Sequence, residues 1–126
     1  MNAAALQFSK FLGSLKDEKS RTALSPERLA NALELSTQGL AALAHVHRNT
    51  VSMAPASAKL QTAMGNVVRV LSAATSLTGD VDHALFWFRN VPIAEFDHLT
   101  AMQLVEQGKA QTVVDYIESI SVGATG

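Results

Sequence analysis

The chain has 126 residues, of which 48% are hydrophobic and 17% are charged. This length is typical of one domain, and the composition excludes both a disordered chain and a highly charged coiled coil. No apolar run approaches the ~18–20 residues that span a bilayer, and the first residues lack the pattern of a secretory signal. Because the chain contains no cysteine, disulfides, thiolate zinc sites and thiol nucleophiles are excluded. We therefore expect a small soluble protein, most simply a cytoplasmic one.

The charged residues are divided unevenly along the chain. Residues 1–78 contain eight Lys and Arg and four Asp and Glu, whereas residues 79–126 contain two and seven. The net charge of −1 therefore combines +4 in the first part with −5 in the second. This division predicts that the first part meets an anionic partner and the second part does not.

Helical periodicity dominates the sequence, and no segment alternates as a strand does. A polar connection over residues 16–25 separates the first two predicted helices. Ser25 as N-cap and Pro26 as first helical residue open the second of these, which is expected to bury Leu29 and Leu33. The first helix is amphipathic, with apolar residues at i, i+3, i+4 and i+7: Phe8, Phe11, Leu12 and Leu15.

Two short helices are predicted next. Ser36 or Thr37 caps a helix that runs to about Ala44, and another begins near residues 47–48. The second of these must end before Pro55, because the residue before a proline disfavours the α conformation. A much longer helix follows over residues 58–76 and ends at Thr78-Gly79. Its apolar stripe consists of Leu60, Met64, Val67, Val68, Leu71 and Ala74.

The last part of the chain predicts three more helices. An aromatic-rich helix gives way before Pro92, and its inward face consists of Val81, Ala84, Leu85 and Phe88. Thr100 and Gln103 form a capping box at the start of the next helix, which Gly108 ends. The final helix turns Ala110, Val113, Val114 and Ile117 inward and leaves a small-residue tail, SVGATG. The prediction is an all-α fold of seven or eight short helices.

Residues 38–52, QGLAALAHVHRNTVS, have the pattern of a helix-turn-helix. Ala41 is small where the second helix approaches the first, and the positions expected to be buried are Leu40, Ala44, Val46, Val51 and Ala54. The second helix then presents polar groups that can hydrogen-bond base edges or phosphates. The predicted DNA-binding residues are Gln38, His47, Arg48, Asn49, Thr50 and Ser52. The alternatives are a corner with no DNA-binding role and, for Arg48, an ordinary surface charge.

This stretch resembles the helix-turn-helix of the Xre type, whose core is commonly L-A-x-x-A-G-V-S-R-x-T-[IV]-S. The matching residues, in order, are Leu40, Ala41, Ala44, Val46, Arg48, Thr50, Val51 and Ser52. The turn glycine of the family is His45 here, and a non-glycine residue enters the left-handed region at some cost. We therefore expect a distorted turn, and a recognition helix shortened by Pro55.

From Gly79 onward the chain resembles the toxin-binding domain of the Xre/MbcA/ParS antitoxin family. The pattern A-x-x-W-[LF] corresponds to Ala84, Trp87 and Phe88, and T-[AP]-x-x-L-[LV] corresponds to Thr100, Ala101, Leu104 and Val105. The final pattern, I-E-x-I-x-x-G, corresponds to Ile117, Glu118, Ile120 and Gly123. Asp97-His98-Leu99 stands where many members have glycine before the capping Thr. The resemblance covers roughly residues 25–126.

The resemblance implies an antitoxin of a type II toxin–antitoxin system. Its C-terminal domain would bind and inhibit a RES-domain toxin that degrades NAD, and its helix-turn-helix would bind operator DNA and repress the operon. The implied toxin-binding residues are Trp87, Phe96, Glu118, Ile120, Val122 and Gly123. The resemblance implies a helix-turn-helix region with the long linking helix (25–78) and a toxin-binding domain (79–126). The predicted N-terminal helix and connection (1–24) precede them and lie outside the resemblance. A single helix-turn-helix gains little specificity, so we also expect a homodimer.

The spacing of the aromatic residues independently predicts a partner-binding surface at Trp87. Adjacent helical residues lie about 100° apart, so Trp87 and Phe88 cannot both face one narrow core. Phe88 belongs to the inward face, which leaves Trp87, and with it Phe86, at the margin as a surface for a partner. The alternative is that Trp87 packs in a second core layer under the loop at 91–99.

Other functions are less well supported by the residues. Glu95, Asp97 and His98 have catalytic side chains but are typical of a solvated turn, and no nucleophile elbow, phosphate loop or zinc-protease motif is present. His45 and His47 have no third ligand at a sensible spacing, so neither a metal nor a cofactor is expected. The main alternative is a stand-alone helix-turn-helix transcriptional regulator whose C-terminal half dimerises or senses a ligand. A neighbouring gene for an NAD-consuming toxin would distinguish the two.

Overall fold

The protein is all-α, as predicted. The structure is a computed structural model that describes residues 2–20 and 22–125, with the backbone alone for residues 123–125. The helices are α1 (Ala3–Ser14), α2 (Pro26–Ala32), α3 (Thr37–Ala44), α4 (Arg48–Met53), α5 (Ala58–Thr78), α6 (Val81–Asn90), the 3-10 turn η1 (Ala94–Phe96), α7 (Ala101–Glu106) and α8 (Ala110–Thr125). Over these residues the β pairing is confined to two isolated bridges, Lys16–Leu24 and Ile93–Leu99.

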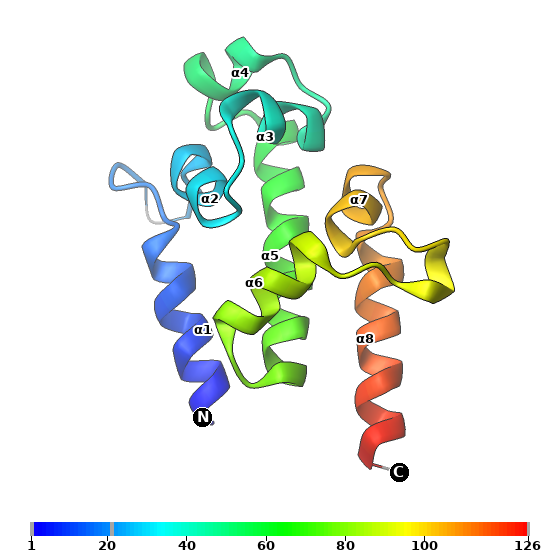
Figure 1. Cartoon of the computed structure of the whole chain (residues 1–126). Coiled ribbons are helices and arrows are strands. Elements are labelled where there is room, and N and C mark those ends of the chain that lie inside the picture. Colours follow the sequence, from blue (N-terminus) through cyan, green and yellow to red (C-terminus); the bar gives the residue numbers. More distant parts are fainter. Residues whose placement is uncertain (1, 21, 126) are drawn as a thin grey trace.

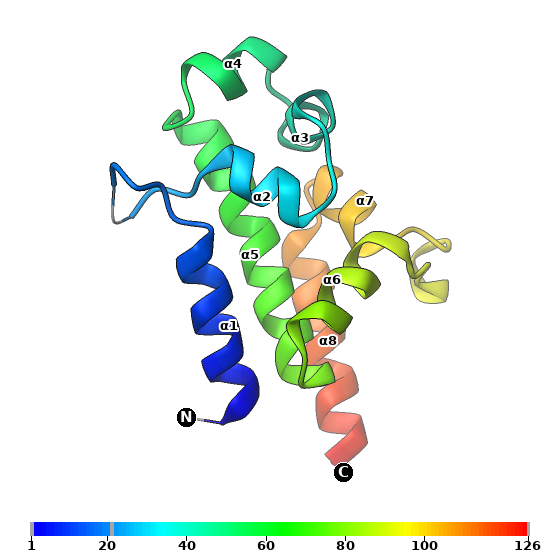
Figure 2. The same cartoon turned by 60° about the vertical axis from the view of Figure 1, so that its left-hand side comes forward.

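The long helix α5 is the axis of the molecule. It packs against α1, α3, α6, α7 and α8, and it runs through the centre of Figure 1 with α1 and α8 on either side. The short helix α4 lies at one end, and both chain termini lie at the other, in the two views of Figures 1 and 2. The molecule therefore has two well-separated ends joined by one helix.

One hydrophobic core connects the elements. It extends from Leu15 to Ile117 and includes buried residues of α2, α3 and α5 to α8. Phe88 is the largest fully buried side chain. Thr75 is the buried polar residue of the described part of the chain, and its hydroxyl donates to the Leu71 carbonyl, so its polar group is satisfied.

The helix ends follow the predicted local signals. Ser25 and Ser36 cap α2 and α3. The side chain of each accepts a hydrogen bond from the backbone N–H three residues later, that of Arg28 and that of Gly39. Thr100 and Gln103 form the predicted capping box at the start of α7, with both hydrogen bonds present. Gly79 ends α5 in the left-handed conformation, so this helix runs two residues further than predicted.

Some of the predicted inward faces are corrected by the structure. In α5, Val70 and Thr75 are buried and Val68 is half-buried, because helices on several sides cover α5. Helix α1 has no buried residue; its Phe8, Phe11 and Leu12 are half-buried, and Leu15 is buried just beyond its end. The predicted tail continues α8 as far as Thr125, since the sequence there holds no proline to stop the helix. Gly126 lies outside the described residues.

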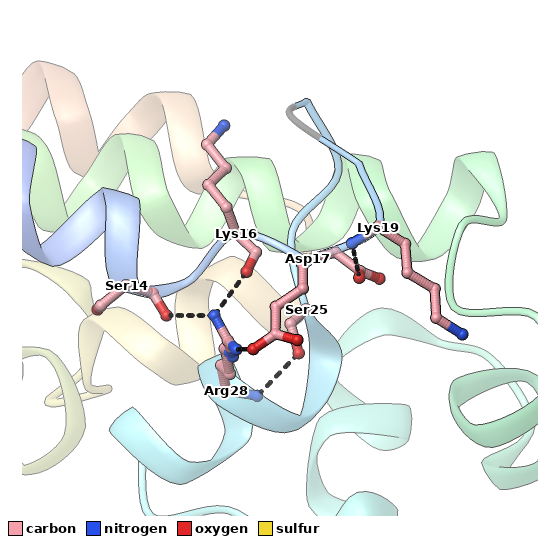
Figure 3. Close-up of polar contacts among 7 residues, drawn as sticks. Ser14, Lys16, Asp17, Lys19, Ser25 and Arg28 are labelled. Atoms are coloured by element: carbon pink, nitrogen blue, oxygen red, sulfur yellow. Dashed lines mark hydrogen bonds and ion pairs between the residues drawn. The ribbon is translucent and has the colours of Figure 1, made fainter.

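Arg28 holds the connection between α1 and α2 in place. Its Nη1 donates to the Lys16 carbonyl at 2.8 Å, and its Nη2 pairs with Glu18 at the same distance (Figure 3). The side chain of Gln61 in α5 also accepts from the Leu24 N–H and donates to the Leu24 carbonyl. These contacts bring the connection beside α2 and α5.

Candidate functional site

The helices α3 and α4 form a tight corner, which we call the α3–α4 corner (residues 37–53). Three residues separate the two helices. His45 adopts the left-handed conformation, with φ 56° and ψ 41°. Its N–H donates to the Ala42 carbonyl at 3.2 Å, and the Val46 N–H donates to the Ala41 carbonyl at 3.0 Å. These are the two bonds of a Schellman motif, so the turn is regular and the distortion expected from His45 is not found.

The His45 side chain explains how the turn accommodates a non-glycine residue. Its Nε2 lies within hydrogen-bonding distance of the Glu106 carbonyl. Glu106 is the last residue of α7, where helix carbonyls lack a partner within the helix. The imidazole therefore caps a second helix while its backbone ends the first, and the α3–α4 corner is tied to α7.

The inner side of the corner is well packed. Leu40 and Ala41 are fully buried, and Ala44 and Val51 are also buried. Val46, which was predicted to be buried, is half-buried. Ala54 is exposed, contrary to the prediction, because α4 ends at Met53 and the chain leaves the helical conformation at Ala54.

The outer side carries the predicted DNA-binding residues. The exposed ones are Gln38, His47, Arg48, Asn49 and Ser52. Thr50 is half-buried. His47 caps α4, because its Nδ1 accepts a hydrogen bond from the backbone N–H of Asn49 at 3.0 Å. Gln38, which is ten residues away in the sequence from Arg48, lines a hollow of about 420 Å³ with Val46, His47 and Arg48. The fold therefore brings the start of α3 beside the start of α4.

The charge near the corner is unusual. Residues 35–79 contain Arg48, Lys59 and Arg69 but no Asp or Glu. The ion pairs found in the described part of the chain are Arg28–Glu18 and Arg89–Glu34, so neither exposed cation near the corner, Arg48 or Lys59, is paired there. This leaves positive charge available to an anionic partner.

A rim of mixed charge borders one side of this surface. Asp17, Glu18 and Glu27 line a hollow of about 630 Å³ whose other wall includes Thr37 and Ser52. The rim also contains Lys19 and Arg28, and Figure 3 shows Lys19 extending outward while Arg28 is bound to the connection. The lining therefore carries both signs of charge, and one of its carboxylates, Glu18, is paired with Arg28.

The aromatic residues of α6 differ from the prediction. Trp87 is half-buried against the core, whereas Phe86 is 56% exposed. Helix α6 packs against both α5 and α7. The face of α6 that carries Trp87 is therefore partly covered, whereas the face that carries Phe86 stays exposed. Phe86 is therefore the aromatic side chain of α6 that is available to a partner, whereas the prediction named Trp87 first.

Phe96 lies in η1 and contacts α8. Its ring meets the Tyr116 ring edge-on, with centroids 5.4 Å apart. Burial raises the pKa of the Tyr116 phenol, and the hydrogen bond with Glu95 and the negative charge of that carboxylate raise this pKa further. Phe96 is half-buried and holds the 91–99 loop against α8, so only part of it is available to a partner.

The remaining predicted partner residues lie near the end of α8. Glu118 and Ile120 are exposed, and Val122 is 70% exposed. Gly123 belongs to the part of α8 of which only the backbone is described. Leu6 in α1 and Leu77 in α5 are further exposed apolar residues that the sequence analysis did not single out. All four of these apolar side chains belong to helix ends on the side of the chain termini (Figure 1).

The described residues contain no group of three or more His, Asp or Glu side chains that could hold a metal ion. His45 and His47 are both engaged in helix capping. In the part of the chain that the structure covers, no helix is long and apolar enough to cross a membrane. Comparisons of the chain with protein-family models, curated proteins and solved structures found no match.

Proposed function

We propose that this protein is an antitoxin that binds operator DNA through the α3–α4 corner and inhibits a RES-domain, NAD-degrading toxin through its C-terminal part. The observation that carries the proposal is the separation of two chemically different exposed surfaces on one core. The corner presents polar groups and unpaired cations, whereas the middle of α6 and the end of α8 present apolar side chains. Two partners of different chemistry fit this arrangement better than one.

The DNA-binding part of the proposal rests on the corner. Arg48, Asn49 and Ser52 are exposed at the end of the molecule, and residues 35–79 lack carboxylates. Arg and Asn are side chains that read guanine and adenine in the major groove. A homodimer would place two such corners on a pseudo-palindromic operator and so supply the specificity that one corner lacks.

The toxin-binding part rests on exposed apolar groups together with the resemblance to the antitoxin family. Phe86 is exposed on α6, and Ile120, Val122 and the charged Glu118 are exposed on α8. Exposed aromatic and aliphatic side chains of this kind are common at protein interfaces. In the family that the sequence resembles, the corresponding helix and tail lie at the toxin's active-site cleft.

Two variants separate the two activities. Arg48→Ala is expected to weaken operator binding by about 1–3 kcal/mol in gel-shift titrations and to leave toxin neutralisation intact. Arg69→Ala is the matched control, because Arg69 is exposed but bonded to Gln111 on α8. Deletion of residues 119–126 is expected to do the reverse, lowering rescue of cells that express the adjacent toxin gene while DNA binding and helicity persist.

The same experiment decides between the antitoxin and the stand-alone regulator. Full rescue by the truncated chain, together with failure of the full chain to co-purify with the neighbouring gene product, would leave a regulator as the function. Equal DNA binding by Arg48→Ala and wild-type protein at every salt concentration would contradict the role of the corner.

A further inference from the structure

The outermost face of α4 is formed by a residue pair that differs from the rest of the corner. Val51 is buried and fixes which side of α4 faces the core. At about 100° per residue, Asn49 and Met53 each lie about 160° from Val51, one on either side, and about 40° from each other. These two side chains therefore point most directly away from the protein, and Arg48 and Ser52 lie to one side of them.

Met53 has no structural reason to be apolar. It is 82% exposed, more than any other large hydrophobic side chain in the described part of the chain. Its exposed neighbours on α4, Asn49 and Ser52, are polar, and the exposed residue that follows it, Ala54, is small. An exposed methionine among the polar side chains of α4 is better suited to a small apolar target within a polar ligand than to a protein interface.

The side-chain amide of Asn49 is also free to bind a ligand. Its backbone N–H caps onto His47, and among the described residues its side-chain amide makes no hydrogen bond. The amide of Asn can bond both N6 and N7 of adenine in the major groove, and an apolar side chain can contact the C5 methyl group of thymine. The N6/N7 edge of adenine and the C5 methyl group of thymine both lie on the floor of the major groove, so adjacent A·T pairs present them side by side.

We propose that Asn49 and Met53 act as one base-reading pair that selects adjacent A·T pairs, with Asn49 on an adenine and Met53 on a thymine methyl. This inference rests on the proposed DNA-binding function and adds the sequence class that the corner reads. Arg48 and Lys59, which no carboxylate pairs in the described structure, attract the duplex, and Asn49 and Met53 add the discrimination for A·T pairs to any base contact that Arg48 makes.

The test begins with selection by the full-length protein from duplexes with a randomised centre. The selected duplex is then bound with deoxyuridine in place of each thymine, which removes the methyl group alone. We expect deoxyuridine at one position to weaken wild-type binding about fourfold, the effect of one buried methyl-sized group, and to leave binding by Met53→Ala unchanged. Asn49→Ala should lose about 5- to 150-fold of the preference for adenine at the neighbouring position.

Matched controls are present in the chain. Leu6→Ala removes a 51% exposed apolar side chain from α1, at the opposite end of the molecule, and should keep the full deoxyuridine effect. Asn31→Ala removes an exposed amide from α2 and should keep the adenine preference.

The outcomes separate this inference from the function beneath it. Enrichment of a duplex with G·C pairs at the positions that depend on Asn49 and Met53, or no deoxyuridine effect at any thymine, overturns the base-reading pair and leaves DNA binding in place. Loss of dimerisation by Met53→Ala with an unchanged deoxyuridine effect also overturns it, since Met53 would then contact a second copy. If no duplex is enriched at any salt concentration, the DNA-binding function fails as well.

Discussion

Two turns of this molecule have the same backbone geometry and different residues. The turn after α3 has His45 at φ 56°, and the turn after α7 has Gly108 at φ 80°. Both are closed by the same pair of bonds, which at the second turn join the Gly108 N–H to the Val105 carbonyl and the Lys109 N–H to the Leu104 carbonyl. Glycine is the expected residue in such a turn, so the histidine needs a separate explanation.

The explanation is that the two turns face each other. His45 reaches the carbonyl of Glu106, two residues before Gly108, across a groove of about 680 Å³ that both turns line. A glycine at position 45 would relieve the backbone but leave that carbonyl without this partner. A residue that is unfavourable for its own turn can therefore still stabilise the fold when its side chain hydrogen-bonds the end of a neighbouring helix.

The largest expected effect comes from the leucines beneath the two turns. Leu40 and Leu104 are both fully buried, one in α3 and one in α7. Each change to Ala is expected to lower the free energy of unfolding by about 2–5 kcal/mol, because the lost side chain leaves a cavity. Urea denaturation followed by circular dichroism measures this loss. Since both leucines belong to one continuous core, we expect a single transition in each variant.

Leu6→Ala is the control for these two variants and should stay within about 0.5 kcal/mol of wild type, because Leu6 is exposed. Two separate transitions in either core variant would show that residues 25–78 and 79–126 unfold independently, and would contradict the single cooperative unit.

The intermediate effect concerns Gly108. A Cβ at this position meets no atom within 4 Å, so Gly108→Ala tests the cost of the left-handed conformation without a steric clash. We expect a loss of about 1–2 kcal/mol. Gly65→Ala is the matched control, because Gly65 lies inside α5 with equally open space around its Cβ. That change should stabilise the protein by about 0.5–1 kcal/mol, and equal signs for the two variants in thermal denaturation would refute the argument.

The smallest effect is expected at His45. In His45→Gly the relief of the left-handed conformation and the loss of the bond to Glu106 are of similar size, about 1 kcal/mol each, so stability should change by less than about 0.5 kcal/mol. His45→Ala keeps the unfavourable conformation and loses the bond, and should be less stable by about 1 kcal/mol. If His45→Ala is as stable as wild type by calorimetry, the imidazole bond contributes nothing, and if His45→Gly is no more stable than His45→Ala, the left-handed conformation costs nothing.

Local signals made most of the helices predictable. Ser25, Ser36 and Thr100 cap helices where the sequence analysis placed the caps, because a side-chain oxygen satisfies backbone N–H groups only a few residues away. The corner at 37–53 was likewise predictable, since its buried and exposed positions follow from helical spacing. Met53 could have been identified in the same way, from its place two residues after the inward-facing Val51.

The contacts between elements were not predictable from one chain. Which aromatic of α6 is exposed, Phe86 rather than Trp87, depends on where α5 and α7 lie. The role of His45 depends on a carbonyl 61 residues away. The sequence by itself determined the helices, their caps and the order of charges, because these depend on neighbours along the chain. Only the tertiary structure decided which side chains stay exposed and which helix ends meet, because both depend on the packing of segments that are distant in the sequence.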